Sequence, residues 1–168
     1  MKSVKALVAS IAIVSLMAML VGTAVMGATV TATVTAQNVA VSVTDGSIAY
    51  GIVNGSEDTT SSVTTGIDDT QVVSNDGNVP ENFDIAGTNS TDWQLGAAAG
   101  DATYEHAWCT SNCDSSPTWS ALSTSANSLA TSVATSGTQA VDFQITVPTS
   151  NAGTNSENVD VNITASAS

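Results

Sequence analysis

After Lys5 this chain of 168 residues contains no lysine and no arginine. Its two basic residues, Lys2 and Lys5, stand against 15 acidic residues, so the formal net charge is −13 and the part beyond Lys5 carries −15. Lys and Arg are the side chains that neutralise nucleic-acid phosphates and anionic membrane surfaces. Phosphoryl transfer, bidentate carboxylate recognition and lysine Schiff-base chemistry depend on them too. We therefore expect no nucleic-acid partner, and no membrane partner once the N-terminus has been removed.

Residues suited to catalysis are equally scarce. The chain has one histidine, His106, and neither a Gly-x-Ser-x-Gly nor a His-Glu-x-x-His motif. Two carboxylates brought together from distant strands are the one hydrolytic arrangement that the sequence leaves open. Aromatic residues number only three Trp, two Tyr and two Phe, so packing in a core is favoured over a sugar-binding platform. We predict that the protein is not an enzyme and needs no cofactor.

The first 27 residues have the layout of a secretory signal peptide. A short basic region ends at Lys5, residues 6–26 are apolar and uncharged, and residues 25–27 place small or modest side chains just before Ala28. We predict cleavage before Ala28, export to the cell surface or medium, and a single domain over residues 28–168. One alternative is an uncleaved anchor helix. Another is a type IV pilin-like subunit that keeps its apolar helix, because the Lys-Ala-Leu-Val sequence at 5–8 resembles the cleavage site of archaeal type IV pilins.

Strict two-residue alternation follows the predicted cleavage site, so a strand with one apolar face is expected there. Threonines and apolar residues alternate over Thr29, Val30, Thr31, Ala32, Thr33, Val34, Thr35 and Ala36. Valines continue the alternation at 39–43, and an Asp-Gly turn at 45–46 leads to residues 48–53, which predicts a hairpin.

The rest of the chain reads as short strands separated by turns. A second hairpin is predicted from 71–74 and 79–85 around an Asn-Asp-Gly-Asn turn, and further strands at 93–95, 104–108, 119–122, 140–147 and 159–165. Residues 52–70 are too polar to bury much, and 123–133 are dense in Ser and Thr, so both are expected to be loop or irregular. The predicted fold is all-β, an antiparallel β-sandwich of jelly-roll or immunoglobulin-like type preceded by the signal helix.

The only two cysteines, Cys109 and Cys113, are separated by three turn-forming residues. In an exported protein this spacing predicts a disulfide that staples the tip of a hairpin. A zinc site built from this pair and His106 does not match the spacing of structural zinc sites.

Acidic residues beside turns offer an alternative chemistry. Asp68, Asp69 and Asp76 are weak candidates for calcium ligands, because calcium prefers hard oxygen ligands. They follow no recognisable calcium-loop spacing, and the favoured interpretation is that they keep a lysine-free surface soluble. Three sequons place potential glycans at Asn54, Asn89 and Asn162 if the host glycosylates exported proteins.

This layout of secretory signal, immediate Val/Thr strand, Val-x-Val segment and small β-sandwich resembles the TasA/camelysin-type biofilm fibre subunits and the archaeal bundling pilins. The resemblance covers 28–53 and 71–85 and implies polymerisation in which the N-terminal strand of one subunit completes the sheet of its neighbour. The lack of lysine and the cysteine pair depart from that group, so its metal and protease associations are not carried over.

The leading hypothesis is a secreted structural subunit of an extracellular filament, matrix fibre or surface layer. In it, residues 29–36 are the assembly strand and other copies of the chain are the partners. The alternative from another class is a monomeric cell-surface module that binds extracellular polysaccharide through exposed tryptophans.

Overall fold

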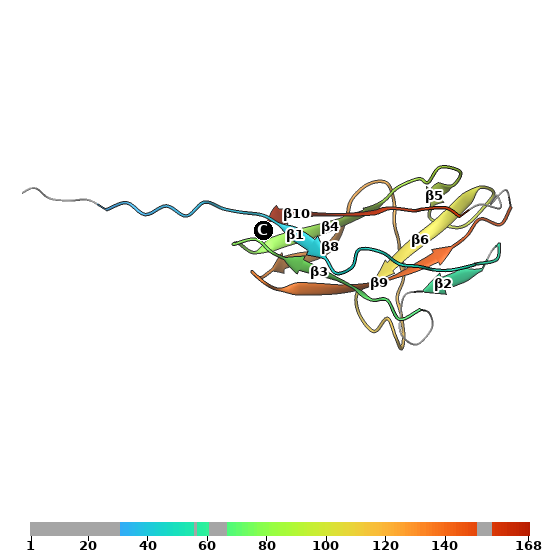
Figure 1. Ribbon diagram of the computed structural model, residues 1–168, viewed down its shortest axis with the longest axis horizontal. Helices are drawn as coiled ribbons and strands as arrows, with labels where there is room; N and C mark the ends of the chain where they lie inside the picture. The colour runs from blue at the N-terminus through green and yellow to red at the C-terminus, as the bar shows by residue number, and fades with distance from the viewer. Residues whose placement is uncertain (1–30, 56, 61–66, 151–155) are drawn as a thin grey trace, which may run out of the picture. The chain divides into compact units, whose positions relative to one another are not determined.

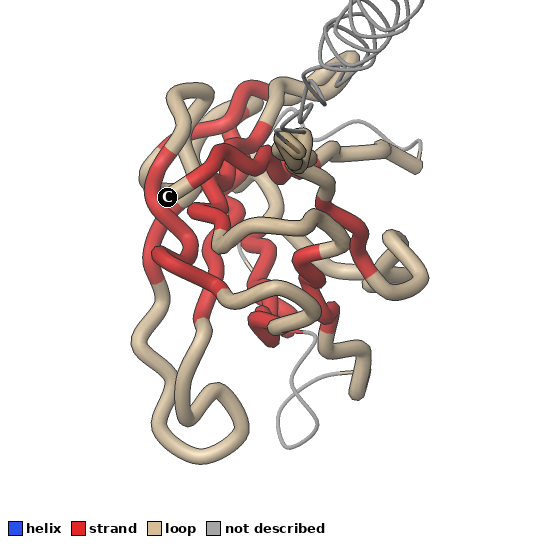
Figure 2. The backbone as a smooth tube through the Cα atoms, turned by 90° about the vertical axis from the view of Figure 1, so that its left-hand side faces the viewer, coloured by secondary structure: helices blue, strands red, loops and turns tan. Residues whose placement is uncertain are grey.

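The computed structural model describes residues 31–55, 57–60, 67–150 and 156–168. The predicted signal peptide and its alternatives, together with Thr29 and Val30, lie outside these ranges. Within them all regular secondary structure is strand (Figure 2), and no helix there is long and apolar enough to cross a bilayer. The chain divides into one unit that ends at Thr35 and a second that runs from Ala36 to Ser168. The first unit has no strand in its described residues, 31–35.

The described residues of the second unit form ten strands in two sheets (Figure 1). The strands are β1 (Val41–Val43), β2 (Asp58–Thr60), β3 (Gln71–Asn75), β4 (Glu81–Gly87), β5 (Gln94–Gly96), β6 (Thr103–Cys109), β7 (Ser120–Ala121), β8 (Asn127–Val133), β9 (Thr138–Thr146) and β10 (Val161–Ala167).

The larger sheet is organised around β9. Its path is β1-β3-β9-β6-β5, with β2 added to β9 and β7 added to β6. The smaller sheet has the order β10-β4-β8. All strand pairs are antiparallel except β5 and β6, which are parallel, so the prediction of a fully antiparallel arrangement is wrong at this edge.

The core lies between the two sheets. Val73, Val141 and Phe143 come from the larger sheet, and Phe83 and Ile85 from the smaller one. Alternation in the sequence produces this layer, because successive side chains of a strand point to opposite faces. The predicted inward residues of β9 are all buried. The all-β, two-sheet prediction is therefore confirmed, and the choice between jelly-roll and immunoglobulin-like topology stays a prediction.

The second predicted hairpin is wrong, because β3 and β4 belong to different sheets. Asn75, buried at the end of β3, explains the change of direction. Its side-chain Nδ2 donates to the carbonyls of Val79 and Val133, both at 2.9 Å, and its Oδ1 accepts from the backbone N–H of Gly77 at 2.9 Å. These bonds hold the connection as an arch from one sheet to the other.

The first predicted hairpin is also wrong. Asp45 and Gly46 have φ values of 64° and 72°, the left-handed pair that a tight two-residue turn requires. Residues 48–53 nevertheless form no strand, and β1 pairs with β3 through Val41↔Asn75 and Val43↔Val73. The Asp45–Gly46 turn could be predicted from the sequence. The absence of strand pairing in residues 48–53, which follow the turn, could not.

Two segments expected to be loops contain strands. Residues 58–60 of the polar segment 52–70 form β2, which extends the larger sheet beside residues 144–146 of β9. Residues 127–133 form β8, which pairs with β4 and buries Leu129. Open edges of β9 and β4 supply backbone partners in both cases, and this pairing overrides the polar composition.

The predicted disulfide is present. Cys109 and Cys113 are joined with a Cα–Cα distance of 5.9 Å. The bond closes the start of the connection between β6 and β7, which pair through Ala107↔Ala121 and Trp108↔Ser120. It therefore staples a hairpin, as the spacing predicted.

Removing this staple is expected to lower the free energy of unfolding by about 2 kcal/mol, because closing so short a loop restricts the unfolded chain only modestly. Urea unfolding of a Cys109→Ser/Cys113→Ser variant measures the loss. Ser111→Ala, in the same exposed loop, is the matched control and should change little. Equal stabilities of the double variant and the control would show that the bond contributes nothing.

Candidate functional site

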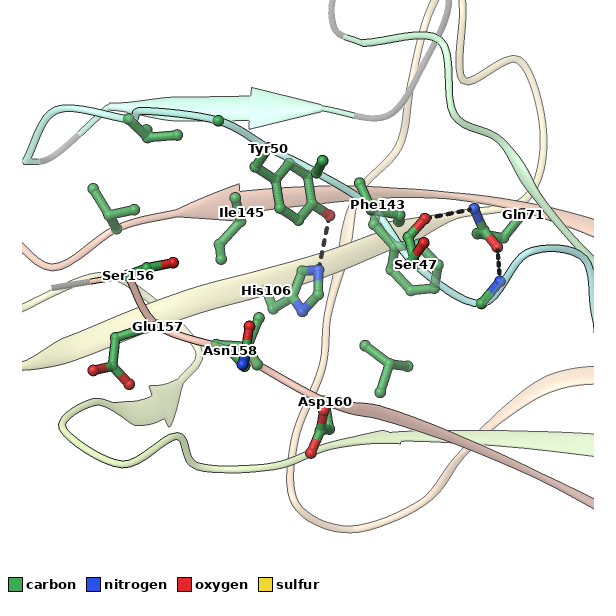
Figure 3. Close-up of a pocket in the computed structure, with 18 of the residues that line it drawn as sticks. Ser47, Tyr50, Gln71, His106, Phe143, Ile145, Ser156, Glu157, Asn158 and Asp160 are labelled. Atoms are coloured by element: carbon green, nitrogen blue, oxygen red, sulfur yellow. Dashed lines mark hydrogen bonds between the residues drawn. The ribbon is translucent and has the colours of Figure 1, made fainter.

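A groove of about 1440 Å³ runs along one side of the second unit. One wall is formed by residues 46–55, the other by residues 156–163, and the floor by side chains of β6 and β9, including His106, Phe143 and Ile145 (Figure 3). The two walls are far apart in sequence, so only the fold brings them together.

Both walls of the groove carry backbone without a ladder partner in the described chain. No hydrogen bond joins the backbone of residues 48–53 to another described residue. On the opposite wall, β10 pairs with β4 alone among the described strands. Unpaired N–H and C=O groups of this kind are a template for an additional strand.

The burial of side chains also shows that the wall formed by β10 lacks a neighbouring strand. In β4 the inward residues Phe83 and Ile85 are 0% exposed. In β10 the equivalent inward residues, Val161, Ile163 and Ala165, are only half-buried although they pack against the same core. A strand laid beside β10 would cover these three side chains, so this wall of the groove lacks one layer of apolar cover.

The floor holds one polar pair. The hydroxyl of Tyr50 lies 3.0 Å from Nε2 of His106, and the imidazole is 3% exposed. The other ring nitrogen, Nδ1, is buried and has no hydrogen-bond partner in the described structure. The ring of His106 also packs against Phe143, with centroids 5.4 Å apart.

Burial sets the protonation of this pair. Desolvation lowers the pKa of His106 to about 4, so the imidazole is neutral at pH 7. Burial also raises the pKa of Tyr50 well above its ordinary value, with smaller contributions from the negative charges of Asp69 and Asp142. A neutral Tyr–His pair is a fixed hydrogen bond in an apolar floor, and it carries no charge to attract an ionic ligand.

The rim of the groove is acidic. Glu157 and Asp160 lie along the wall formed by residues 156–163 (Figure 3). Because the chain has no lysine or arginine beyond Lys5, no lysine or arginine side chain near the groove balances them. An occupant of the groove is therefore expected to be apolar or polar and free of acidic side chains.

Residues just before β1 are held by side chains from the connection between β3 and β4 and from the first residue of β4. Asn78 accepts from the N–H of Asn38 through Oδ1 at 2.7 Å and donates from Nδ2 to the carbonyl of Ala36 at 2.8 Å. Fully buried Glu81 accepts from the N–H of Ala40 at 2.9 Å. We call these contacts the clamp. It fixes the chain from Ala36 onward.

The segment ahead of the clamp is the one predicted to be an assembly strand. Residues 31–36 form no strand in the structure, and Val34 is 93% exposed. A strand needs backbone partners, and alternation alone does not supply them. The predicted strand is thus not formed over the described part of 29–36.

The calcium candidates are not brought together. Asp69 accepts from Nε2 of Gln71 at 2.8 Å, and the backbone N–H of Asp76 donates to Ala40. Asp68 is exposed and has a φ of 54°. Across the described residues there is no group of three or more His, Cys, Asp or Glu side chains placed to hold a metal.

The three predicted glycan acceptors are exposed. The amide of Asn54 donates to Glu57 at 2.8 Å, Asn89 accepts from the N–H of Leu95 at 2.9 Å, and Asn162 points outward from β10 beside the groove.

None of the three tryptophans is exposed. Trp108 packs against the core, Trp93 lies 6.0 Å from the ring of Tyr104, and Trp119 is half-buried. The expectation that packing uses most of the aromatic residues is confirmed for these side chains.

No protein-family model, curated protein or solved structure matches this chain. The resemblance to fibre subunits thus stays a prediction from the sequence layout, and the groove has to be interpreted from its own residues. Sequence reasoning missed the groove and the Tyr50–His106 pair. The available signal was the alternation of Ile48, Tyr50 and Ile52, which predicted the return strand of a hairpin rather than the wall of a groove.

The lowered pKa of His106 predicts loss of stability in mild acid. Below its ordinary pKa of 6.5 the unfolded chain binds a proton that the folded protein does not take up until about pH 4. The free energy of unfolding should therefore fall by about 3 kcal/mol as the pH drops from 6.5 to 4. Urea unfolding of the wild type and of His106→Gln at pH 7 and pH 4 isolates this contribution, because the carboxylates titrate in both. An identical pH dependence in the two proteins would contradict it.

Proposed function

We propose that this protein is a secreted, non-enzymatic structural subunit of an extracellular filament, matrix fibre or surface layer. Each subunit adds residues 29–36, the donor segment, to the groove of the next copy. The observation that carries the proposal is the groove itself, with two walls of backbone that lack a ladder partner and with Val161 and Ile163 half-buried along one of them. Such a surface is completed by one extended strand.

The donor segment has the properties that the groove requires. It contains no charged residue, alternates Thr with Val or Ala, and forms no strand over residues 31–36. Eight extended residues span about 26 Å, comparable to the length of a seven-residue edge strand such as β10. Its apolar face would bury against half-buried residues of the groove, and each valine would contribute roughly 1.5 kcal/mol or more.

The clamp supports the formation of a regular polymer, because it fixes the point at which the donor segment leaves its own subunit. Because Asn78 and Glu81 hold residues 36–40, the donor segment emerges from a fixed position on its own subunit. A fixed emergence point gives every subunit the same relation to the next, which a regular polymer requires. A segment on a long loose linker would give no such constraint.

Two alternatives are separated from this proposal by direct measurements. If the apolar N-terminus is kept, as in a type IV pilin-like subunit, the mass of the cell-surface protein will include residues before Ala28, whereas the proposal expects a chain that starts near Ala28. If the protein is instead a monomeric polysaccharide-binding module, it will stay at monomer size and bind glycans, with Trp93 as the one tryptophan that lines the described groove.

Deleting residues 28–35 is expected to abolish polymers and leave a folded monomer. The deletion ends before Ala36, so it removes the donor segment and leaves the clamp intact. Electron microscopy and light scattering of the exported protein and the deletion variant give the result. Replacing the same residues with a Gly/Ser segment of equal length is the matched control and should also fail to assemble. Filaments formed by either variant would rule out strand addition.

Assembly is also expected to depend on salt, because subunits that each carry −15 repel one another. Raising NaCl from about 10 mM to about 150 mM shortens the Debye length from about 30 Å to about 8 Å. The critical concentration for polymerisation, measured by sedimentation, should fall several-fold over this range. The deletion variant should stay monomeric at both concentrations. A critical concentration that rises with salt would indicate attraction between charges instead.

A further inference from the structure

The open edges of the two sheets differ in how well they can accept another strand. In the larger sheet, β1, β2, β5 and β7 have only two or three residues each. In the smaller sheet, β8 has seven residues, but its pairing with β4 shifts register twice and Ser132 has a φ of 51°, so its edge is irregular. β10 also has seven residues, and these pair with β4 in one unbroken register. Among the described strands, β10 therefore offers the longest regular open edge.

β10 also lacks the features that protect an edge strand from other chains. Charged side chains, prolines and bulges are the usual protections. The sequence of β10, Val-Asn-Ile-Thr-Ala-Ser-Ala, contains no charged residue and no proline, and its ladder with β4 has no bulge. Nothing within the strand itself therefore prevents a further strand from pairing with it.

Hydrogen bonds at the two ends of the β10–β4 ladder show which backbone groups face the open edge. The N–H of Thr88 donates to the carbonyl of Asp160 at 3.1 Å, and the N–H of Ser168 donates to the carbonyl of Pro80 at 3.0 Å. Both bonds continue the register of the ladder. The even-numbered residues of this segment therefore direct their N–H and C=O groups toward β4. Because this direction alternates along an antiparallel ladder, the odd-numbered residues of β10 direct theirs toward the open edge.

Two of these odd-numbered residues, Val161 and Ile163, line the groove. Their side chains are half-buried against the core, whereas the side chains of Asn162 and Thr164 are exposed. A strand that bonds to the backbone of Val161 and Ile163 turns the residues directly opposite them toward the core as well. The donor segment fits both faces, because its Val and Ala residues alternate with Thr. Its threonines would lie beside Asn162 and Thr164 on the outer face.

The opposite wall of the groove is a poorer template for a strand. Gly51, within residues 48–53, has a φ of 75°, which interrupts an extended backbone. Tyr50 is bonded to His106, and the side chain of Ile52 is 100% exposed. The backbone groups of this wall therefore do not form the regular alternating row that a ladder requires.

We propose that the open edge of β10 is the acceptor for the donor segment of another copy, and that the backbone groups of Val161 and Ile163 bind it. The proposal rests on the proposed function and adds to it the edge and the atoms at which the strand is added. The donor segment carries no charge, so the carboxylates of Glu157 and Asp160 at the rim do not repel it. The three-stranded sheet gains a fourth strand, which covers the half-buried side chains of β10.

Amide hydrogen exchange tests the acceptor edge without any substitution. The exported chain is measured below its critical concentration and again as filaments. The amides of Val161 and Ile163 are expected to exchange at least about tenfold more slowly in filaments, because they gain partners there. The amides of Asn162 and Thr164, which already bond to β4, should be protected in both states. Equal exchange of Val161 and Ile163 in the two states would overturn the proposal.

Proline substitution tests the same edge through assembly. Ile163→Pro removes an N–H of the acceptor edge, and the fold should tolerate it because that N–H takes no part in the ladder. Ile163→Ala is the matched control, since it also removes the large side chain but keeps the N–H. The critical concentration of Ile163→Pro should exceed that of Ile163→Ala by about tenfold or more, at similar urea midpoints. Asn162→Pro removes an N–H that bonds β4 and should lower the urea midpoint.

Two results of the proline series would contradict the acceptor edge. One is a critical concentration of Ile163→Pro equal to that of Ile163→Ala. The other is a larger loss of stability in Ile163→Pro than in Asn162→Pro, which would mean that the N–H of residue 163 faces β4. Either result leaves strand addition standing if deletion of residues 28–35 still abolishes filaments. Filaments formed without residues 28–35 would instead overturn the proposed function together with its acceptor.

Discussion

Backbone groups along the two walls of the groove, residues 48–53 and β10, are the constraint on which the rest of the structure depends. A peptide N–H or C=O must find a partner or stay in contact with water. Here the walls stay open, and Val161 and Ile163 of β10 are half-buried where the inward residues Phe83 and Ile85 of β4 are fully buried. A domain with this defect gains stability from any strand that fills it. Under the proposed function, that strand is the donor segment of another copy.

Open sheet edges are usually protected, often by lysine, because they pair with other chains indiscriminately. This body has no lysine, and its protection is negative charge. Glu157 and Asp160 at the groove and the −15 of the whole body oppose casual association of copies. Under the proposed function, charge would discriminate between the uncharged donor segment and the acidic surfaces of other copies.

The strands with clear alternation, such as β6 and β9, could be predicted from the sequence because alternation is a local pattern. The disulfide between Cys109 and Cys113 could be predicted for the same reason, since it depends on the short spacing of the two cysteines. The sheet to which each strand belongs could not be predicted from local spacing. β3 and β4 look like a hairpin, and only the side-chain bonds of Asn75 turn the connection into an arch. β8 has few apolar residues and forms because β4 offers it an edge. The groove is harder still, since its walls come from opposite ends of the domain.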